Sequence, residues 1–212
     1  MLLASGRIPK EFTMAAGKYQ SFAGAKGASQ SDKKLERLSL PNDLKGKSVL
    51  DIGCNEGFFC LEAARRGAAR VVGIDQSAHF VDAARSRSRE FSQIEYIKGD
   101  AKNLPDEKFD IILVLSVIHY FENPYDIFCD ILSHLKPNGI LILECGVANG
   151  TGKAVKRALR SIDERFFPTI EMLRSVWLKD FAVRYITHSV SQAGDPIPRM
   201  VFHCSPLKTN VI

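Results

Sequence analysis

The strongest structural signal in this 212-residue chain is the segment Val49-Leu-Asp-Ile-Gly-Cys-Asn-Glu-Gly-Phe-Phe59. Its apolar start predicts a short strand that stops at Gly53, and helix-forming residues begin at Phe58 after a turn. Glycines let the backbone pass close to a ligand, and a helix N-terminus beside them offers N–H groups to it. Asp51, two residues before the first glycine, suits a ligand that carries an ammonium group. We interpret the segment as a ligand-binding turn, with an ordinary strand-to-helix connection as the alternative.

Strands and helices are predicted to alternate along the middle of the chain. Apolar runs predict strands at 48–52, 70–74, 94–97, 109–115 and 139–144. The segments between them predict helices at 58–66, 78–90 and 124–135. Alternation of this kind is typical of a parallel sheet with helices on both faces.

The last third of the chain follows a different pattern. Apolar residues at helical spacing predict an amphipathic helix over 151–162, and a second helix is predicted over 169–178. Two strands are predicted at 182–191 and 199–204. The link between them is too short for a crossover helix, so we expect this pair to be antiparallel.

Positive charge gathers at both ends of the chain. The net charge is +5, and residues 1–48 and 151–212 each carry an excess of positive charge, whereas the middle is acidic. We expect residues 1–36 to form a basic arm that ends in a short helix with Ser31 as its N-cap, and residues 37–212 to form one domain. The charge pattern favours a basic entrance for an anionic partner, with simple solubility as the alternative.

Composition argues against several classes of protein. The five cysteines are odd in number and have no Cys-x-x-Cys spacing, which argues against a disulfide framework or a zinc site. We therefore expect no bound metal and a reducing, cytoplasmic location. We also expect no membrane segment and no secretion signal, because the chain has neither a long apolar run nor an apolar N-terminal region.

Two further loops follow predicted strands in order. Asp75 closes the second strand, where a carboxylate can accept hydrogen bonds from both hydroxyls of a ribose; a surface helix cap is the alternative. Gly99-Asp-Ala101 follows the third strand, where a carboxylate and backbone N–H groups can contact an adenine edge. In order, the three loops would contact methionine-like, ribose and adenine parts of one ligand.

Over residues 46–205 the chain resembles the class I S-adenosylmethionine-dependent methyltransferases of the type 11 and 12 domains. The resemblance is carried by Asp51 to Gly57, Asp75, Asp100, the strand at 109–115 and Lys136-Pro-Asn-Gly139. It implies an α/β, Rossmann-like sheet of seven mostly parallel strands in the order 3-2-1-4-5-7-6, with strand seven antiparallel and helices on both faces. It also implies that arm residues such as Lys18 and Tyr19 form a lid over the cofactor. Asn55 stands where the family usually has glycine.

The resemblance implies S-adenosylmethionine as cofactor and S-adenosylhomocysteine as product. The expected cofactor-binding residues are Asp51, Gly53, Cys54, Asn55, Gly57, Phe58, Asp75, Gln76, Asp100, Ala101, Leu115 and Ser116. The candidate catalytic residues are His119, Tyr120 and Glu144, at the ends of the fourth and fifth strands. His119 could act as a general base, because the pKa of a free histidine lies near neutrality. The alternative is that His119 and Tyr120 pack under the cofactor and that alignment drives the transfer.

These features predict a methyltransferase that acts on an O or N atom of a small, anionic acceptor, as a monomer or homodimer. Nucleic acid is the alternative partner, although a net charge of +5 is modest and no RNA-binding module is visible. In its favour, Phe166-Phe-Pro-Thr169 weakly resembles the tRNA wobble-uridine carboxymethyl-transferring branch. A non-catalytic cofactor-binding partner protein is a third interpretation. A nicotinamide-binding domain is disfavoured, because Asn55 and Phe58 replace two glycines of the G-x-G-x-x-G pattern.

Overall fold

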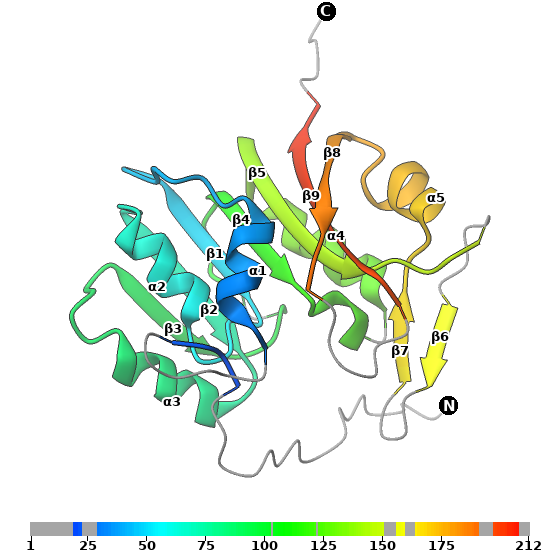
Figure 1. Ribbon diagram of the computed structural model, residues 1–212. Helices are drawn as coiled ribbons and strands as arrows, with labels where there is room; N and C mark the ends of the chain where they lie inside the picture. Colours follow the sequence, from blue (N-terminus) through cyan, green and yellow to red (C-terminus); the bar gives the residue numbers. More distant parts are fainter. Residues whose placement is uncertain are drawn as a thin grey trace, which may run out of the picture.

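The computed structural model describes residues 19–22, 29–102, 104–121, 123–150, 156–159, 164–190 and 197–207. A seven-stranded sheet forms the centre (Figure 1). In order across the sheet, its strands are β3 (Ile94–Lys98), β2 (Arg70–Asp75), β1 (Ser48–Ile52), β4 (Phe109–Leu115), β5 (Leu135–Gly146), β9 (Arg199–Pro206) and β8 (Phe181–His188). Within this sheet β9 is antiparallel to both of its neighbours, and the other six strands are parallel. The predicted strand order and the antiparallel strand are confirmed.

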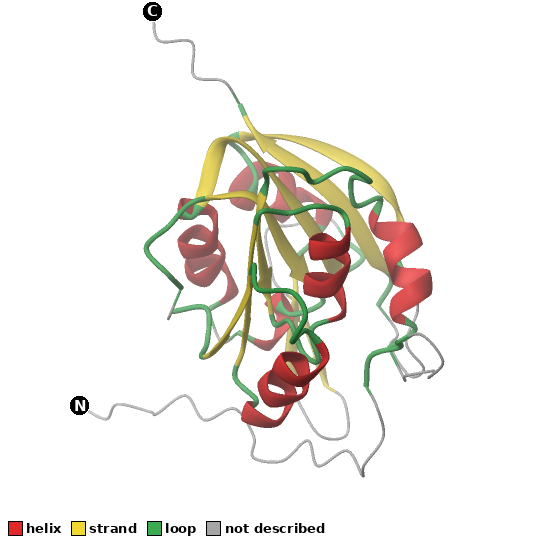
Figure 2. Cartoon of the chain, turned by 90° about the vertical axis from the view of Figure 1, so that its left-hand side faces the viewer, coloured by secondary structure: helices red, strands yellow, loops and turns green. Residues whose placement is uncertain are grey.

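Helices cover both faces of the sheet (Figure 2). One face packs against α1 (Ser31–Leu38), α2 (Phe58–Arg65) and α3 (Ala78–Arg87). The other face packs against the 3-10 turn η1 (Ile118–Tyr120), α4 (Pro124–Ser133), and α5 (Ile170–Met172), which continues as the π-helix η2 (Leu173–Trp177). Because strand side chains alternate, Val49 and Leu113 face the first layer, whereas Leu50 and Val114 face the second. The predicted parallel sheet between two helical layers is therefore confirmed.

The carboxyl ends of the parallel strands meet at one edge of the sheet. Ile52 of β1 pairs with Ile74 of β2, and Leu115 of β4 pairs with Glu144 of β5. The start of β9 lies at the same edge, since Arg199 pairs with Gly146. This edge thus gathers the loops after β1 to β5 and the beginning of β9, and ligands of open α/β sheets bind at such edges.

The structure corrects the helix predicted over residues 151–162. Lys156–Leu159 forms strand β6, which pairs antiparallel with β7 (Glu164–Phe167); the rest of the predicted helix lies outside the described residues. Phe167 gives the physical reason. Its side chain is 1% exposed, its ring stacks on His119, and it fills the space next to Gly146. Packing at the sheet edge therefore overrides the local helical pattern.

The N-terminal segment differs from its prediction in one detail. The N-cap of α1 is Gln30, and Ser31 is the first helical residue. The Ser31 hydroxyl instead hydrogen bonds the Ser29 hydroxyl at 2.6 Å. Residues 1–18 and 23–28, including Lys18 of the predicted lid, lie outside the described residues. No helix within the described ranges is long and apolar enough to span a membrane.

Candidate functional site

The turn between β1 and α2 has a left-handed backbone. The φ angle is 74° at Gly53, 56° at Asn55 and 84° at Gly57. Asparagine tolerates this region better than most residues with a side chain, which explains how Asn55 can stand where a glycine is expected. A Cβ atom on Gly57 would collide with the Tyr96 hydroxyl beneath it. The turn is therefore fixed by its dihedral angles and by its packing.

The ends of the first three strands are joined by backbone hydrogen bonds. The N–H groups of Gly53 and Cys54 donate to the carbonyl oxygen of Ile74 at 2.8 and 3.0 Å. The N–H of Gly99 donates to the carbonyl oxygen of Asp75 at 3.0 Å. The three loops thus lie side by side in the order of the strands that they follow.

Asp51 is buried beneath the glycine turn. The Cys60 thiol donates to its Oδ2 atom at 3.5 Å. Burial raises the pKa of Asp51 to about 7, because the charged form loses its hydration. A cation above the turn would favour the ionised form. Cys54 is also buried, and burial raises the pKa of the Cys60 thiol, so neither cysteine has the environment of a nucleophile.

Both carboxylate oxygens of Asp75 accept backbone hydrogen bonds. The Asn55 N–H donates to Oδ2 and the Ser77 N–H to Oδ1, each at 2.9 Å. The helix cap of α3 is Ser77, whose hydroxyl accepts the Phe80 N–H, so Asp75 does not have the capping role that was the alternative. A carboxylate oxygen can accept more than one hydrogen bond, so each oxygen can receive a further donor. Burial raises the pKa of Asp75.

The remaining predicted contacts of the cofactor follow β2, β3 and β4. Gln76 is exposed directly after Asp75. Asp100 accepts the Lys102 N–H at 2.8 Å, and Ala101 between them is buried. Leu115 and Ser116 are half-buried at the end of β4, where Ser116 has a φ angle of 58°.

A buried polar network lies at the ends of β4, β5 and β9. Glu144 is fully buried, and its Oε2 atom receives the Lys34 ammonium of α1 and the Ser116 hydroxyl, each at 2.8 Å. The Ser189 hydroxyl donates to Oε1. Arg199 donates to the Ser116 hydroxyl at 2.9 Å. The network therefore connects α1 to three neighbouring strand ends.

The surroundings of Glu144 keep it ionised. Burial alone would raise the pKa of Glu144, but the Lys34 ammonium and the hydroxyls of Ser189 and Ser116 hold it below its usual value. Uptake of a proton would break the ion pair with Lys34, which makes Glu144 a weak general base and a strong positioning group. Its catalytic role stays a prediction.

His119 lies under the same edge. Its side chain is 1% exposed, and its ring stacks on Phe167 with centroids 5.2 Å apart and planes inclined by 24°. The ring centroid of Tyr120 lies 4.5 Å from that of His119, and the Tyr120 side chain is 45% exposed. This packing favours the interpretation that His119 supports the site, while the Tyr120 side chain is the one open to solvent. A general-base role for either stays a prediction.

The sequence patterns did not single out Gln20 or Arg199 as site residues, and they counted Lys34 among the charges of a basic entrance, whereas the structure buries Lys34 against Glu144. The Gln20 side chain accepts the N–H of Phe58 at 3.0 Å, so this predicted cofactor contact already has a partner. Lys34 had a readable signal, because it shares the buried face of α1 with Ser31 and Leu38 at helical spacing. Arg199 and Gln20 had none, since no local pattern reports what they meet across the fold.

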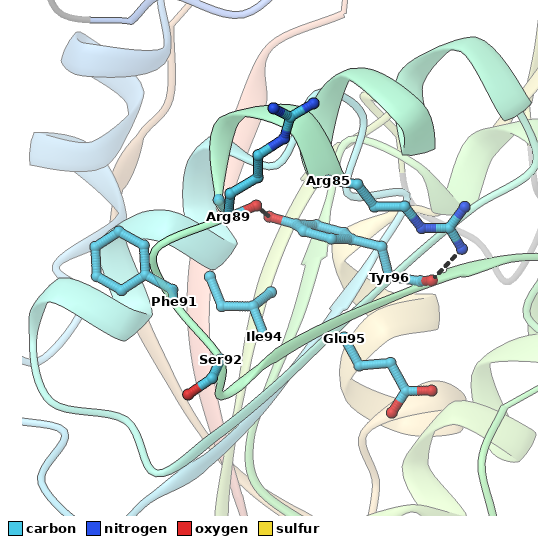
Figure 3. Close-up of a pocket in the computed structure, with 8 residues that line it drawn as sticks. Arg85, Arg89, Phe91, Ser92, Ile94, Glu95 and Tyr96 are labelled. Carbon is cyan, nitrogen blue, oxygen red and sulfur yellow. Dashed lines mark hydrogen bonds between the residues drawn. The ribbon is translucent and has the colours of Figure 1, made fainter.

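A surface hollow of about 500 Å³ lies at the opposite edge of the sheet (Figure 3). Arg85 of α3 and Arg89, two residues after α3 ends, line it together with Ile94 and Tyr96 of β3. The hollow does not include residues of the glycine turn, although Tyr96 contributes to its lining and packs with its hydroxyl against Gly57 of that turn. Within the described ranges, no group of three His, Cys, Asp or Glu side chains is placed to hold a metal ion.

Several known proteins are similar in sequence to part of this chain. Residues 50–143 match the family model described as a methyltransferase domain. The tRNA U34 carboxymethyltransferase of Photobacterium profundum is 31% identical over 186 residues, which are 78% of this chain and 55% of that protein. The ubiquinone biosynthesis O-methyltransferase of Maricaulis maris is 33% identical over 126 residues, 58% of this chain and 48% of that protein. The chain spans about half the length of these curated relatives.

A solved structure shares the fold. A protein from Listeria monocytogenes, described as an S-adenosylmethionine-dependent methyltransferase, superposes with a TM-score of 0.67 over 84% of this chain and 100% of that chain. The two sequences are 18% identical, so this likeness concerns the arrangement of the chain and not its substrate.

Proposed function

We propose that this chain, whose residues 50–143 match the methyltransferase domain family and which has the fold of an S-adenosylmethionine-dependent methyltransferase, binds that cofactor and transfers its methyl group to an acceptor. The observation that carries the proposal is the order of carboxylates at adjoining strand ends. Asp51, Asp75 and Asp100 belong to β1, to β2 and to the loop after β3, and backbone hydrogen bonds hold the three loops together.

The chemistry of these groups fits the proposed cofactor. Asp75 can accept two ribose hydroxyls while its backbone hydrogen bonds persist, and Asp100 with Ala101 offers an acceptor and an N–H to adenine. Asp51 and the glycine turn suit the ammonium end of a methionine. A pyrophosphate would instead meet the buried Glu56 at the start of α2, where Gln20 already occupies the Phe58 N–H. The proposed set further includes Gly53, Cys54, Asn55, Gly57, Gln76, Leu115 and Ser116.

We propose that catalysis depends on how the chain positions the methyl donor and the acceptor. S-adenosylmethionine would supply a methyl group activated by its sulfonium. The chain would hold donor and acceptor in line and exclude water, which converts a bimolecular reaction into an effectively unimolecular one. Tyr120 is proposed to contact the acceptor from its exposed position, and Glu144 to hold Lys34 and Ser116 in place.

The donor is tested by calorimetry. S-adenosylmethionine and S-adenosylhomocysteine should bind, and nicotinamide dinucleotides should not. Tight binding of a dinucleotide without binding of either sulfur compound would contradict the proposal. Turnover of labelled S-adenosylmethionine with acceptor mixtures separates an enzyme from a non-catalytic cofactor-binding partner protein.

The acceptor is proposed to be a small anionic molecule. This rests on the excess positive charge of the arm and of residues 151–174, which include Lys153, Lys156, Arg157 and Arg160. Reversing Lys156, Arg157 and Arg160 to Glu should raise KM for the acceptor, more at low than at high salt. An unchanged KM at both salt concentrations would contradict a basic entrance.

A tRNA acceptor is the second candidate, because the Photobacterium relative is named for tRNA U34. Labelled donor should be offered in parallel to total tRNA and to a fraction of small anionic metabolites. Label in the tRNA alone would favour the second candidate over the first.

A further inference from the structure

Helix α2 begins without a capping side chain of its own. Its N-cap is Gly57, which has no side chain, and the first N–H groups of any helix lack partners within the helix. The Gly57 N–H donates to the carbonyl oxygen of Cys54 at 3.0 Å, inside the turn. The next N–H, that of Phe58, has to find an acceptor elsewhere in the chain.

Gln20 of the N-terminal segment supplies this acceptor. Its Oε1 atom accepts the Phe58 N–H at 3.0 Å, and its own backbone N–H donates to the Glu56 carboxylate at 2.8 Å. Gln20 and Glu56 are each 5% exposed. Gln20 thus bonds both sides of Gly57, the last residue of the proposed cofactor turn.

Aromatic contacts hold the same segment in place. The ring centroids of Phe22 and Phe58 lie 5.8 Å apart. The guanidinium of Arg87, the last residue of α3, lies 4.4 Å from the centroid of the Phe22 ring. Arg87 also pairs with Glu56 at 3.2 Å. The ring centroids of Tyr19 and Phe80 lie 6.2 Å apart, and Phe80 belongs to the first turn of α3, which follows the Asp75 loop.

The segment is tied to α1 at its other end. The Ser29 N–H donates to the carbonyl oxygen of Tyr19 at 2.9 Å, and the Ser21 N–H donates to the Ser31 hydroxyl at 3.3 Å. Residues 19–22, which we name the capping segment, are therefore fixed between the starts of α1, α2 and α3.

We propose that Gln20 is a positioning residue for the cofactor turn. It caps α2 from outside the helix. The ion pair of Glu56 with Arg87 and the packing of Phe22 between Arg87 and Phe58 hold the capping residue in place. The proposal rests on the proposed function only in naming the cofactor, because the cap itself is a property of the unliganded fold. Loss of the cap frees the Phe58 N–H and lets Gly57 and its neighbours sample other conformations, so cofactor binding has to restore their order.

The test compares Gln20→Ala with Gln20→Met, which keeps the length of the side chain and removes only its hydrogen-bond acceptor. Hydrogen exchange of the Phe58 amide and calorimetry with S-adenosylhomocysteine are the two readouts. Loss of one buried hydrogen bond should speed Phe58 exchange and weaken binding by about 3- to 10-fold each. Gln20→Met should change both readouts in the same direction as Gln20→Ala, because it also lacks the acceptor for the Phe58 N–H. Phe22→Ala, which removes the anchor and not the cap, should act in the same direction as Gln20→Ala.

Gln93→Ala is the matched control, since it removes the same amide group at the start of β3, away from the turn. It should change neither readout. Unchanged Phe58 exchange in Gln20→Ala would overturn the cap, and faster exchange with unchanged affinity would overturn the positioning role. If the unaltered chain does not bind S-adenosylhomocysteine, the proposed function is wrong. Hydrogen exchange of the Phe58 amide then tests by itself whether Gln20 caps α2.

Discussion

The carboxyl group of Asp51 lies inside the fold, under the glycine turn, with a thiol as hydrogen-bond donor. Its pKa of about 7 lies far above its ordinary value of 3.8, chiefly because of burial. Between these two pH values the folded state keeps a proton that the unfolded state has lost. Asp51 therefore lowers stability progressively as the pH rises through this range.

The variant Asp51→Asn should remove this pH dependence. Its free energy of unfolding, measured in urea between about pH 4 and 8, should fall less steeply with pH than that of the unaltered chain. Asp110 gives a pH dependence of opposite sign below this range. Although burial opposes the shift, Lys136 and Ser48 lower the pKa of Asp110 to about 2, so its stabilising contribution is lost as the pH falls toward that value. Parallel curves for the unaltered chain and Asp51→Asn would contradict the prediction.

Asp75 permits a direct test of ribose recognition. If it accepts two hydroxyls, Asp75→Ala removes two hydrogen bonds to a charged group, each worth about 1.5–3 kcal/mol. The affinity for S-adenosylhomocysteine should then fall by about 100- to 10,000-fold. Asp82→Ala on the exposed side of α3 is the control. Unchanged affinity in a folded Asp75→Ala protein would limit Asp75 to its bonds with Asn55 and Ser77.

The β6–β7 hairpin joins the sheet edge through Phe167. A Cβ atom on Gly146 would collide with the Phe167 ring. Next to this contact, the Ala148 N–H donates to the carbonyl oxygen of Pro168 at 2.9 Å. Gly146 is thus the position where a side chain would displace the hairpin from its place.

Gly146→Ala should destabilise the chain by about 1–3 kcal/mol, because the added methyl group overpacks the contact. The cost should shrink when Phe167→Leu is present, since leucine leaves more room. Urea unfolding of the two single variants and the double variant measures this coupling. Additive costs would show that the ring does not limit the space at Gly146.

At the scale of the whole molecule, the buried network around Lys34 and Glu144 connects the first helix with the last strands of the sheet. Lys34 belongs to α1, Glu144 to β5, and the same network reaches Ser189 after β8 and Arg199 at the start of β9. The His203 ring also hydrogen bonds the carbonyl oxygen of Leu38 at 2.8 Å. The first helix and the last two strands therefore close around one buried group.

Lys34→Met should destabilise the chain by about 3–5 kcal/mol, because it leaves Glu144 buried without its counter-charge. Glu144→Gln in the same chain should recover part of this loss, since a neutral amide costs less to bury. Thermal and urea unfolding of the single and double variants provide the measurement. A loss below about 1 kcal/mol for Lys34→Met would place the pair among weak surface ion pairs.

The sequence by itself determined the parallel sheet and the place of the glycine turn after β1. Both depend on local signals: apolar runs of strand length, glycines after a strand, and a carboxylate at each strand end. The strand bounds Ser48–Ile52 and Phe109–Leu115 agree with the prediction residue for residue. Local signals suffice here because a buried strand has to be apolar, and because a left-handed turn needs glycine or asparagine.

Only the tertiary structure decided what surrounds the turn. Residues 156–159 carry a helical pattern and yet form a strand, because Phe167 of the pairing strand is buried against Gly146 and His119. Gln20 caps a helix 38 residues away, and Lys34 neutralises Glu144 across the fold. Such contacts follow from which segments the sheet brings together. Their free energy comes from burial and pairing between distant residues, and a local pattern, even where it indicates that a residue is buried, does not identify its partner.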